Sequence, residues 1–323
     1  MKKVKFLITA GRKYGMGHLI RCISLASMIK KLFICEFFLS KDSVGYEKSL
    51  KDFTFHLIKD TNEFINNLRP KEIVIVDSYS FNQNIFKEIK KMNVVLGVID
   101  DLLEKNENVD FIINHANYTD KSSLLKGKTY ILGAKYALLR PQFLKKINVK
   151  YESPPKKVFI CFGGTDSKNF TLNTIKNIDS IKSNLSLDIV VGSSYVFTEK
   201  LTNYIEKNRN KNIRISHDLS ANEMVSKMKK NDLLIIPASG ILFEAISVRK
   251  PIVSGFVTNN QNMIYKGFKK SEIFYDAIDF SFENFVRAWN NINNLTSRLF
   301  IENQKKVIDK NSPVRFRKIF SKL

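Results

Sequence analysis

The fold of this chain is decided by residues 4–18, which read VKFLITAGRKYGMGH. The first six of these residues are β-prone and mostly apolar, so they predict a strand. The glycines Gly11, Gly15 and Gly17 follow, and residues 17–31 then repeat apolar side chains at helical spacing. Glycine lets the backbone approach a ligand closely, and a helix start offers unpaired N–H groups to an anion. The stretch therefore predicts a strand, a glycine loop and a helix, which is how a parallel α/β domain opens.

The same alternation of short apolar runs and helical patterns continues outward from this stretch. In the first half we expect a helix at 82–92 and further strands at 32–38, 54–58, 72–77, 94–100 and 111–114. The pattern then restarts, with helices at 167–178 and 223–230 and strands at 157–162, 187–191, 212–215, 232–237 and 251–255. Continuous apolar strands separated by helices predict parallel sheets that are covered on both faces.

A polar, proline-broken segment separates the two patterns. We expect a first Rossmann-like domain at 1–147, a linker at 148–156 and a second Rossmann-like domain at 157–323. Two such halves predict an α/β fold of the GT-B type, in which the domains face each other across a cleft and the ligand lies against the carboxyl ends of the strands. Residues 282–294, 297–309 and 314–323 form a helical extension, and the last helix of such folds often crosses back to the first domain.

The charge of the chain favours an anionic small-molecule substrate. Its 323 residues contain 53 Lys plus Arg against 31 Asp plus Glu, a net charge of +22. The excess is spread along the chain, and the abundance of Lys, Asn and Ile is typical of an AT-rich genome. No motif for binding nucleic acid accompanies the charge, so we expect no nucleic-acid partner; a weak association with an anionic membrane stays open.

Hydrophobic runs and cysteines indicate the compartment. The apolar runs are too short to span a bilayer, and the stretch at 6–10 is too short for a signal peptide. Cys22, Cys35 and Cys161 cannot all pair, and no two of them have metal-ligand spacing. We therefore expect a cytoplasmic protein without a metal or cofactor. The oligomeric state stays open, with a monomer favoured.

His18 is the strongest candidate for a catalytic base. It lies at the start of the first helix, with Arg21 one turn further on. The positive end of the helix dipole and the guanidinium both disfavour a charged imidazolium, so a basic ring stays available to activate water. A histidine that only caps the helix or touches a phosphate is the plainer alternative. The glycine spacing differs from G-x-G-x-x-G, which disfavours NAD.

The second half offers two further anion-binding turns. The strand at 157–162 leads into Gly163, Gly164 and Thr165, and the strand at 232–237 leads into Ser239 and Gly240. Their backbone N–H groups could hold a pyrophosphate at a helix start. The plainer alternative for the first turn is a tight turn capped by Asp166 or Ser167.

Two polar features lie beyond these turns. Glu244 follows about one turn into the helix after Gly240, where a carboxylate can accept both hydroxyls of a ribose; a salt bridge to a lysine is the plainer explanation. Asn260 and Gln261 lie in a polar loop after the strand at 251–255 and are suited to contact a sugar.

Taken in order, these motifs resemble the UDP-sugar hydrolase family of the pseudaminic acid pathway, which is related to the glycosyltransferase that makes lipid II. The resemblance covers roughly residues 3–275 and rests on several short motifs: 15–18 with Arg21, Asp77-Ser78-Tyr79, Asp100-Asp101, 136–140, 163–166, 238–239 with Glu244, and Asn260-Gln261. The segment 114–117 departs from the spacing of that family.

The resemblance implies hydrolysis of UDP-2,4-diacetamido-2,4,6-trideoxy-β-L-altropyranose to UDP and the free sugar, without a metal, on the route to a nonulosonic acid for flagellin or surface polysaccharide. It implies that His18 activates water and that Tyr79 and Asn260 orient the water or the sugar. The residues expected to contact the UDP-sugar are Gly15, Gly17, Arg21, Asp77, Gly163, Gly164, Thr165, Ser239, Gly240, Glu244 and Gln261.

Two other functions remain open. A GT-B glycosyltransferase would use the same UDP-binding domain, and its base would deprotonate an acceptor hydroxyl instead of water, so His18 does not separate the two. A non-catalytic nucleotide-sugar or nucleic-acid binding protein would bind without turnover, and on nucleic acid its affinity would fall steeply with salt.

Overall fold

The computed structural model describes residues 1–9, 16–41, 47–78, 83–103, 107–117, 124–147, 150–181, 185–207 and 212–323. The chain divides into two compact units, residues 1–141 with 310–323, and residues 142–309. The boundary between the units falls before the segment 148–156, and the last helix returns to the first unit, as it often does in such folds. The limits 1–147, 148–156 and 157–323 therefore stay predictions.

The first unit is built on a parallel sheet that, among the described residues, has seven strands in the order β3-β2-β1-β4-β5-β6-β7. Its strands are β1 Lys3–Ile8, β2 Ile34–Ser40, β3 Thr54–Ile58, β4 Ile73–Asp77, β5 Val95–Ile99, β6 Phe111–Asn114 and β7 Thr129–Leu132. Its helices are α1 Gly17–Ile29, α2 Glu47–Leu50, α3 Thr61–Asn66, α4 Gln83–Lys91, η2 Ala134–Tyr136 and α13 Ser312–Phe320, and α5 Pro141–Leu144 follows at the boundary.

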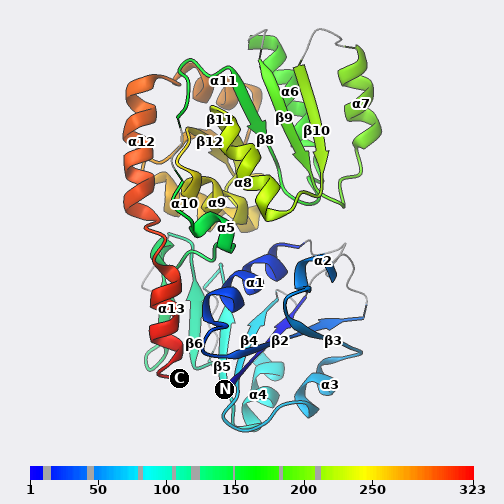
Figure 1. Cartoon of the computed structure of the whole chain (residues 1–323), viewed down its shortest axis with the longest axis vertical. Coiled ribbons are helices and arrows are strands. Elements are labelled where there is room, and N and C mark those ends of the chain that lie inside the picture. Colours follow the sequence, from blue (N-terminus) through cyan, green and yellow to red (C-terminus); the bar gives the residue numbers. More distant parts are fainter. Residues whose placement is uncertain are drawn as a thin grey trace. The chain divides into compact units, whose positions relative to one another are not determined.

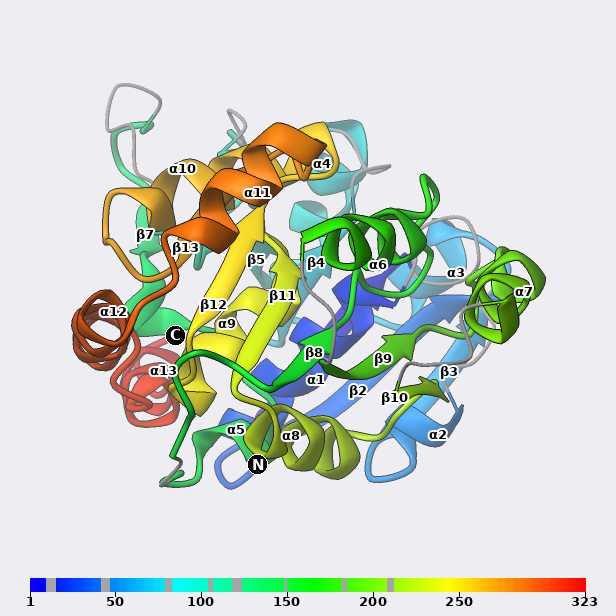
Figure 2. The ribbon, with the colours of Figure 1, turned by 90° about the horizontal axis from the view of Figure 1, so that it is seen from above.

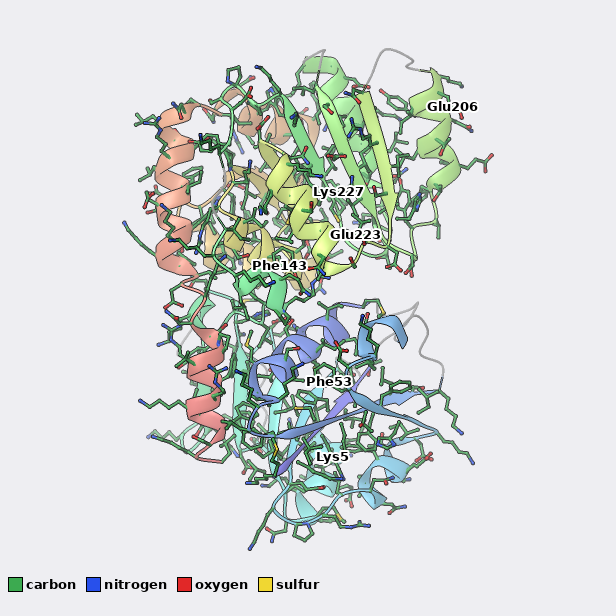
Figure 3. The ribbon with its side chains drawn as sticks, viewed as in Figure 1. Lys5, Phe53, Phe143, Glu206, Glu223 and Lys227 are labelled. Carbon is green, nitrogen blue, oxygen red and sulfur yellow. The ribbon has the colours of Figure 1, made fainter. Side chains whose placement is uncertain are left out.

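Alternating side chains of the strands bury both faces of this sheet. Leu7 and Phe38 pack with apolar residues of α3 and α4 on one face, and α1 lies on the opposite side (Figure 1). On the α3 face, β1 also carries the buried Lys5 (Figure 3), whose Nζ donates to the carbonyl of Asn67 at 2.5 Å and lies 2.9 Å from Glu72 Oε2. The cation is thus paired, as a buried charge requires.

The last helix closes the first unit. Phe316 and Phe320 of α13 are buried, and the Phe320 ring contacts Phe33 and Phe111 edge-on at 6.0 and 5.9 Å between centroids. The Arg317 guanidinium also donates to the carbonyl of Met28 on α1, at 3.1 Å. These aromatic contacts explain why the helix belongs to the first unit, and why both ends of the chain lie close together there (Figure 1).

The second unit contains a six-stranded parallel sheet, counted over its described part, in the order β10-β9-β8-β11-β12-β13. Its strands are β8 Lys157–Ile160, β9 Ser186–Val191, β10 Asn212–His217, β11 Leu233–Pro237, β12 Ile252–Gly255 and β13 Tyr275–Ile278. Its helices are α6 Phe170–Ile181, α7 Thr198–Lys207, α8 Ala221–Lys230, α9 Gly240–Val248, η3 Asn259–Gln261, α10 Asn262–Lys269, α11 Phe282–Asn290 and α12 Asn294–Val307.

Helices cover both faces of the second sheet. Figure 2 shows α6 and α11 on one side of it and α8 on the other. Leu172 and Ile175 of α6 join Phe285 of α11 in one apolar cluster with the strands. On the other side, Lys227 of α8 (Figure 3) pairs with Asp188 of β9 at 3.0 Å. The expected parallel α/β architecture of both halves is confirmed.

Candidate functional site

Each sheet has a point where the strand order reverses, and ligands of open α/β sheets bind outside the carboxyl ends of the strands at such points. In the first unit this point lies between β1 and β4, which pair side by side up to Ile8 and Asp77. Thr9 follows β1 and donates its hydroxyl to Ser78 after β4, at 2.6 Å. Helix α1 begins nearby at Gly17, with His18 as its second residue.

His18 is bonded to Asp77 at this point. The distance from His18 Nδ1 to Asp77 Oδ1 is 2.5 Å, and the Asp77 side chain is fully buried. Burial works to raise the pKa of Asp77, but the charges and hydrogen bonds of Arg21 and His18 outweigh it and hold that pKa well below its usual range. An ionised carboxylate can only accept, so Nδ1 of the ring is the donor. Nε2 is then the nitrogen that accepts a proton when the ring is neutral.

Arg21 joins Asp77 to a second buried carboxylate. Its Nε lies 2.5 Å from Asp77 Oδ2 and one of its terminal nitrogens lies 2.6 Å from Oδ1, which makes a bidentate pair. The other terminal nitrogen donates to Asp101 Oδ2, just after β5. Burial works to raise the pKa of Asp101, but Arg21, aided by His115, lowers it below its usual value. Both carboxylates and the guanidinium are therefore charged at neutral pH.

His115, which follows β6, completes the cluster. It is buried, and its Nδ1 accepts from the backbone N–H of Leu138 at 3.3 Å. The neutral ring therefore carries its proton on Nε2, which lies 3.8 Å from Asp101 Oδ1. Burial, helped by Arg21 and opposed by Asp101, lowers the pKa of His115 to about 4. No motif of the sequence predicts that His115 lies in this cluster.

The lowered pKa of His115 predicts an acid-sensitive fold. Between pH 6.5 and 4 the unfolded chain takes up a proton at this ring while the folded chain does not, so this contribution to stability is complete above pH 6.5 and falls as the pH decreases. Between pH 7 and 5, the parent should lose about 2 kcal/mol more of its unfolding free energy than His115→Gln. The amide oxygen of this variant can still accept from Leu138. Urea unfolding at both pH values measures this. Equal losses in both proteins would contradict the assignment.

In the second unit the strand order reverses between β8 and β11, and a glycine turn follows β8. Gly163 has a φ of +90°, a backbone conformation that favours glycine. The backbone of Gly164 approaches Gly192 so closely that a Cβ at Gly192 would meet the Gly164 Cα at 2.4 Å. Asp166 accepts from the backbone N–H groups of Phe170 and Thr171 at 2.8 and 2.9 Å, so a carboxylate already caps α6.

The neighbouring helix start, after β11, has a different character. Ser239 is the N-cap of α9 but makes no side-chain capping bond, and the first turn of α9 contains no acidic residue. A Cβ at Gly240 would meet no atom within 4 Å, so the helix start is open to an approaching group. Glu244 lies one turn further along α9 and is buried. Of the two helix starts, α9 is therefore better suited to an anion.

The loop after β12 is held by its own side chains. Gln261 Oε1 accepts from the backbone N–H of Val257 at 2.9 Å, and the Thr258 hydroxyl donates to Asn260 Oδ1 at 2.5 Å. Asn260 is exposed. The loop thus presents a polar, ordered surface at the carboxyl end of β12.

The structure brings the expected site residues together in three places. His18, Arg21 and Asp77 meet at the first reversal point, close to Gly17, which starts α1. Gly163, Gly164 and Thr165 follow β8, and Ser239 and Gly240 follow the neighbouring strand β11 at the second. Asn260 and Gln261 lie in η3. Gly15 and Tyr79 lie outside the described residues.

Asp77 and Arg21 contact each other and the neighbouring residues of the first unit. Both carboxylate oxygens of Asp77 accept from His18 or Arg21, and the Arg21 guanidinium spans Asp77 and Asp101. These contacts hold His18 in place, and the expected contacts of Asp77 and Arg21 with the UDP-sugar stay predictions.

Neither a metal-binding cluster nor a membrane-spanning helix is present among the described residues. They contain no group of three or more His, Cys, Asp or Glu side chains arranged to hold a metal ion. No helix in the described part of the chain has the length and apolar character needed to cross a bilayer.

Comparisons with known proteins found relatives at low identity, and no protein-family model matches the chain. A protein of Methanocaldococcus jannaschii described as uncharacterized is 25% identical over 287 residues, which are 83% of this chain and 58% of that protein. The UDP-2,4-diacetamido-2,4,6-trideoxy-β-L-altropyranose hydrolase of Campylobacter jejuni is 27% identical over 262 residues, 76% of this chain and 89% of that enzyme. The chain thus spans less than two thirds of the first of these relatives. The second likeness supports the resemblance that the motifs predict.

Solved structures with similar folds cover almost the whole chain. The UDP-GlcNAc 2-epimerase of Neisseria meningitidis bound to UDP-GlcNAc has a TM-score of 0.69 at 12% identity, over 99% of this chain and 100% of that one. The MurG protein of Acinetobacter baumannii has a TM-score of 0.65 at 11% identity, over 99% and 100%. These likenesses confirm the GT-B fold that the sequence predicts.

Proposed function

We propose that this chain hydrolyses a UDP-linked 2,4-diacetamido-2,4,6-trideoxy sugar of the altrose type to UDP and the free sugar. The observation that carries the proposal is the His18–Asp77 pair at the reversal point of the first sheet, at 2.5 Å. An imidazole held by a buried carboxylate is a suitable general base for water. The relative in Campylobacter jejuni, named for this hydrolysis, supplies the substrate class.

In the proposed reaction, His18 Nε2 takes a proton from a water molecule. The water oxygen forms a bond to the anomeric carbon, the bond from that carbon to the diphosphate oxygen breaks, and its electron pair leaves with UDP, inverting the anomeric configuration. Asp77 stabilises the imidazolium that forms, in the same way that a carboxylate supports other catalytic histidines. Tyr79 and Asn260 are proposed to orient the water or the sugar.

The second unit is proposed to bind the departing UDP. A diphosphate is already a good leaving group, so the reaction does not need the paired carboxylates of ordinary glycosidases. We assign the diphosphate to the N–H groups at Ser239 and Gly240, because the alternative helix start at α6 is capped by the Asp166 carboxylate. Gly163, Gly164 and Thr165 lend backbone contacts from the neighbouring turn, and Gln261 contacts the sugar from η3. Helix N–H groups and the helix dipole stabilise the charge that develops on the leaving oxygen.

Turnover without an acceptor tests the proposal. Proton NMR of the purified chain with the UDP-sugar should show free sugar and UDP, with the first anomer formed inverted at C1. Glycosyltransfer, another reaction compatible with a GT-B fold, would leave the UDP-sugar unconsumed until an acceptor is added. Binding of UDP without turnover would overturn hydrolysis of this sugar, and consumption after an acceptor is added would then separate transfer from binding without catalysis.

Glu244 is proposed to accept the ribose hydroxyls of UDP. Replacing its carboxylate by an amide in Glu244→Gln removes charge-assisted hydrogen bonds that are worth about 1.5–3 kcal/mol, which is roughly a 10- to 150-fold loss of UDP affinity. Calorimetric titration with UDP measures this loss.

A matched control separates binding from folding at Glu244. Glu302→Gln removes the same charge from an exposed ion pair with Lys305 on α12 and should bind UDP within twofold of the parent. Unchanged UDP affinity in Glu244→Gln, together with a lowered melting temperature, would make Glu244 a structural residue of α9.

A further inference from the structure

The cluster around His18 extends further than a base and its carboxylate. From Asp77 it continues through Arg21 to Asp101, and from Asp101 to His115. These residues come from α1, from the end of β4 and from the segments after β5 and β6, which are neighbouring strands of the sheet. Asp101 and His115 have no place in the proposed reaction as described so far.

The charges of this cluster do not cancel. Arg21 supplies one positive charge, while Asp77 and Asp101, whose pKa values are both lowered, supply two negative charges. His115 is neutral at physiological pH because its pKa is about 4. Cys22, which lies 3.5 Å from Asp77 Oδ2, stays a neutral thiol because burial raises its pKa. With a neutral His18 ring, these six side chains together therefore contain one more negative than positive charge.

We propose that Asp101 is a positioning residue that strengthens the binding of a proton by His18. It does so by sharing the Arg21 guanidinium with Asp77, so that Arg21 neutralises Asp77 less completely. With Asp101 present, one guanidinium serves two carboxylates, so Asp77 keeps a share of its negative charge for the imidazolium. Without Asp101, Arg21 and Asp77 would form a neutral pair behind His18, and the ring would hold a proton less strongly. His115 supports this arrangement by lying 3.8 Å from the second oxygen of Asp101.

The titration of His18 itself tests the proposal without any substrate. Removing the negative charge in Asp101→Asn should move the midpoint of the His18 ring titration to lower pH, because the imidazolium loses a stabilising charge. The measurement is NMR of protein with ¹⁵N-labelled histidine. The chain has four histidines, so comparison with His18→Ala assigns the resonances.

Two further variants make the test specific. Asp110→Asn removes the same charge in the same unit from a half-exposed pair with Lys90 and should leave the midpoint unchanged. Asp101→Glu keeps the charge and should restore most of the parent midpoint. A midpoint that does not move in Asp101→Asn, or that moves equally in Asp110→Asn, overturns the proposal. Should Asp101→Asn fail to fold, Asp101→Ser removes the charge with a smaller side chain and gives the same test.

The kinetic part of the inference rests on the proposed function. In a working hydrolase, Asp101→Asn should lower kcat about 10-fold, a fraction of what a general base contributes, with KM within twofold. The two proposals fail separately. A shifted midpoint in a protein that does not hydrolyse the UDP-sugar would sustain the role of Asp101 and remove the hydrolysis. If the parent hydrolyses the UDP-sugar but the His18 midpoint does not shift in Asp101→Asn, the hydrolysis is sustained and the role of Asp101 is removed.

Discussion

Replacing His18 by asparagine is expected to lower kcat by roughly 10²- to 10⁴-fold, which is the contribution typical of a general base. Asparagine cannot take a proton from water, but its side-chain amide can still donate a hydrogen bond to Asp77. The buried carboxylate therefore keeps its partners, and the fold of the first unit is preserved. UDP affinity should stay within twofold of the parent, because the residues proposed to hold UDP belong to the second unit.

His56→Asn is the matched control for this variant. His56 is an exposed residue of β3 in the same unit, and its ring stacks on Phe38 at 4.7 Å between centroids. Its kcat should stay within twofold of the parent. NMR assays of turnover and calorimetry with UDP measure both variants. Near-normal turnover in His18→Asn would remove His18 from the mechanism, whatever its contact with Asp77.

Most of the fold could be predicted because buried parallel strands leave a strong trace in the sequence. Central strands such as β4 and β11 are buried at every residue, so they read as continuous apolar runs. The edge strand β7, Thr129–Leu132, has only one fully buried residue and was not expected. The return of α13 to the first unit depends on contacts of Phe320 with Phe33 and Phe111, more than 200 residues away in sequence, which no local pattern encodes.

Individual residues of the candidate site could be predicted from the sequence, but the contacts between them could not. His18 was identified from its place at a helix start, and Asp77 and Arg21 were expected to contact the substrate, but their contacts with each other were not expected. Their mutual contacts join residues 56 positions apart, and Arg21 reaches Asp101 across 80 positions. Asp101 belongs to a motif of the resemblance but received no role, and one signal could have placed both Asp101 and His115 in the cluster. Both follow strands that are neighbours in a parallel sheet, and the carboxyl ends of such strands meet at one edge.

The buried ion cluster also predicts the largest effect on stability. Arg21→Met is expected to lower the free energy of unfolding of the first unit by about 3–5 kcal/mol, because it leaves two buried carboxylates without their shared cation. Hydrogen exchange of the backbone amides in β1 and β4 measures the stability of this sheet alone. Lys227→Met is the matched control, because it removes a single cation from a partly exposed pair with Asp188 in the second unit and should cost about 1 kcal/mol or less there.

The pH dependence of the Arg21→Met deficit distinguishes charge from packing. Without the guanidinium, Asp77 and Asp101 lose the group that holds their pKa values down, and burial then raises both. Protonation removes the uncompensated charges, so the deficit relative to the parent should shrink as the pH falls from 8 to 5. A lost packing contact would cost the same at every pH in this range. A deficit that stays constant would therefore show that the methylene stem of Arg21, and not its charge, stabilises the cluster on which His18 depends.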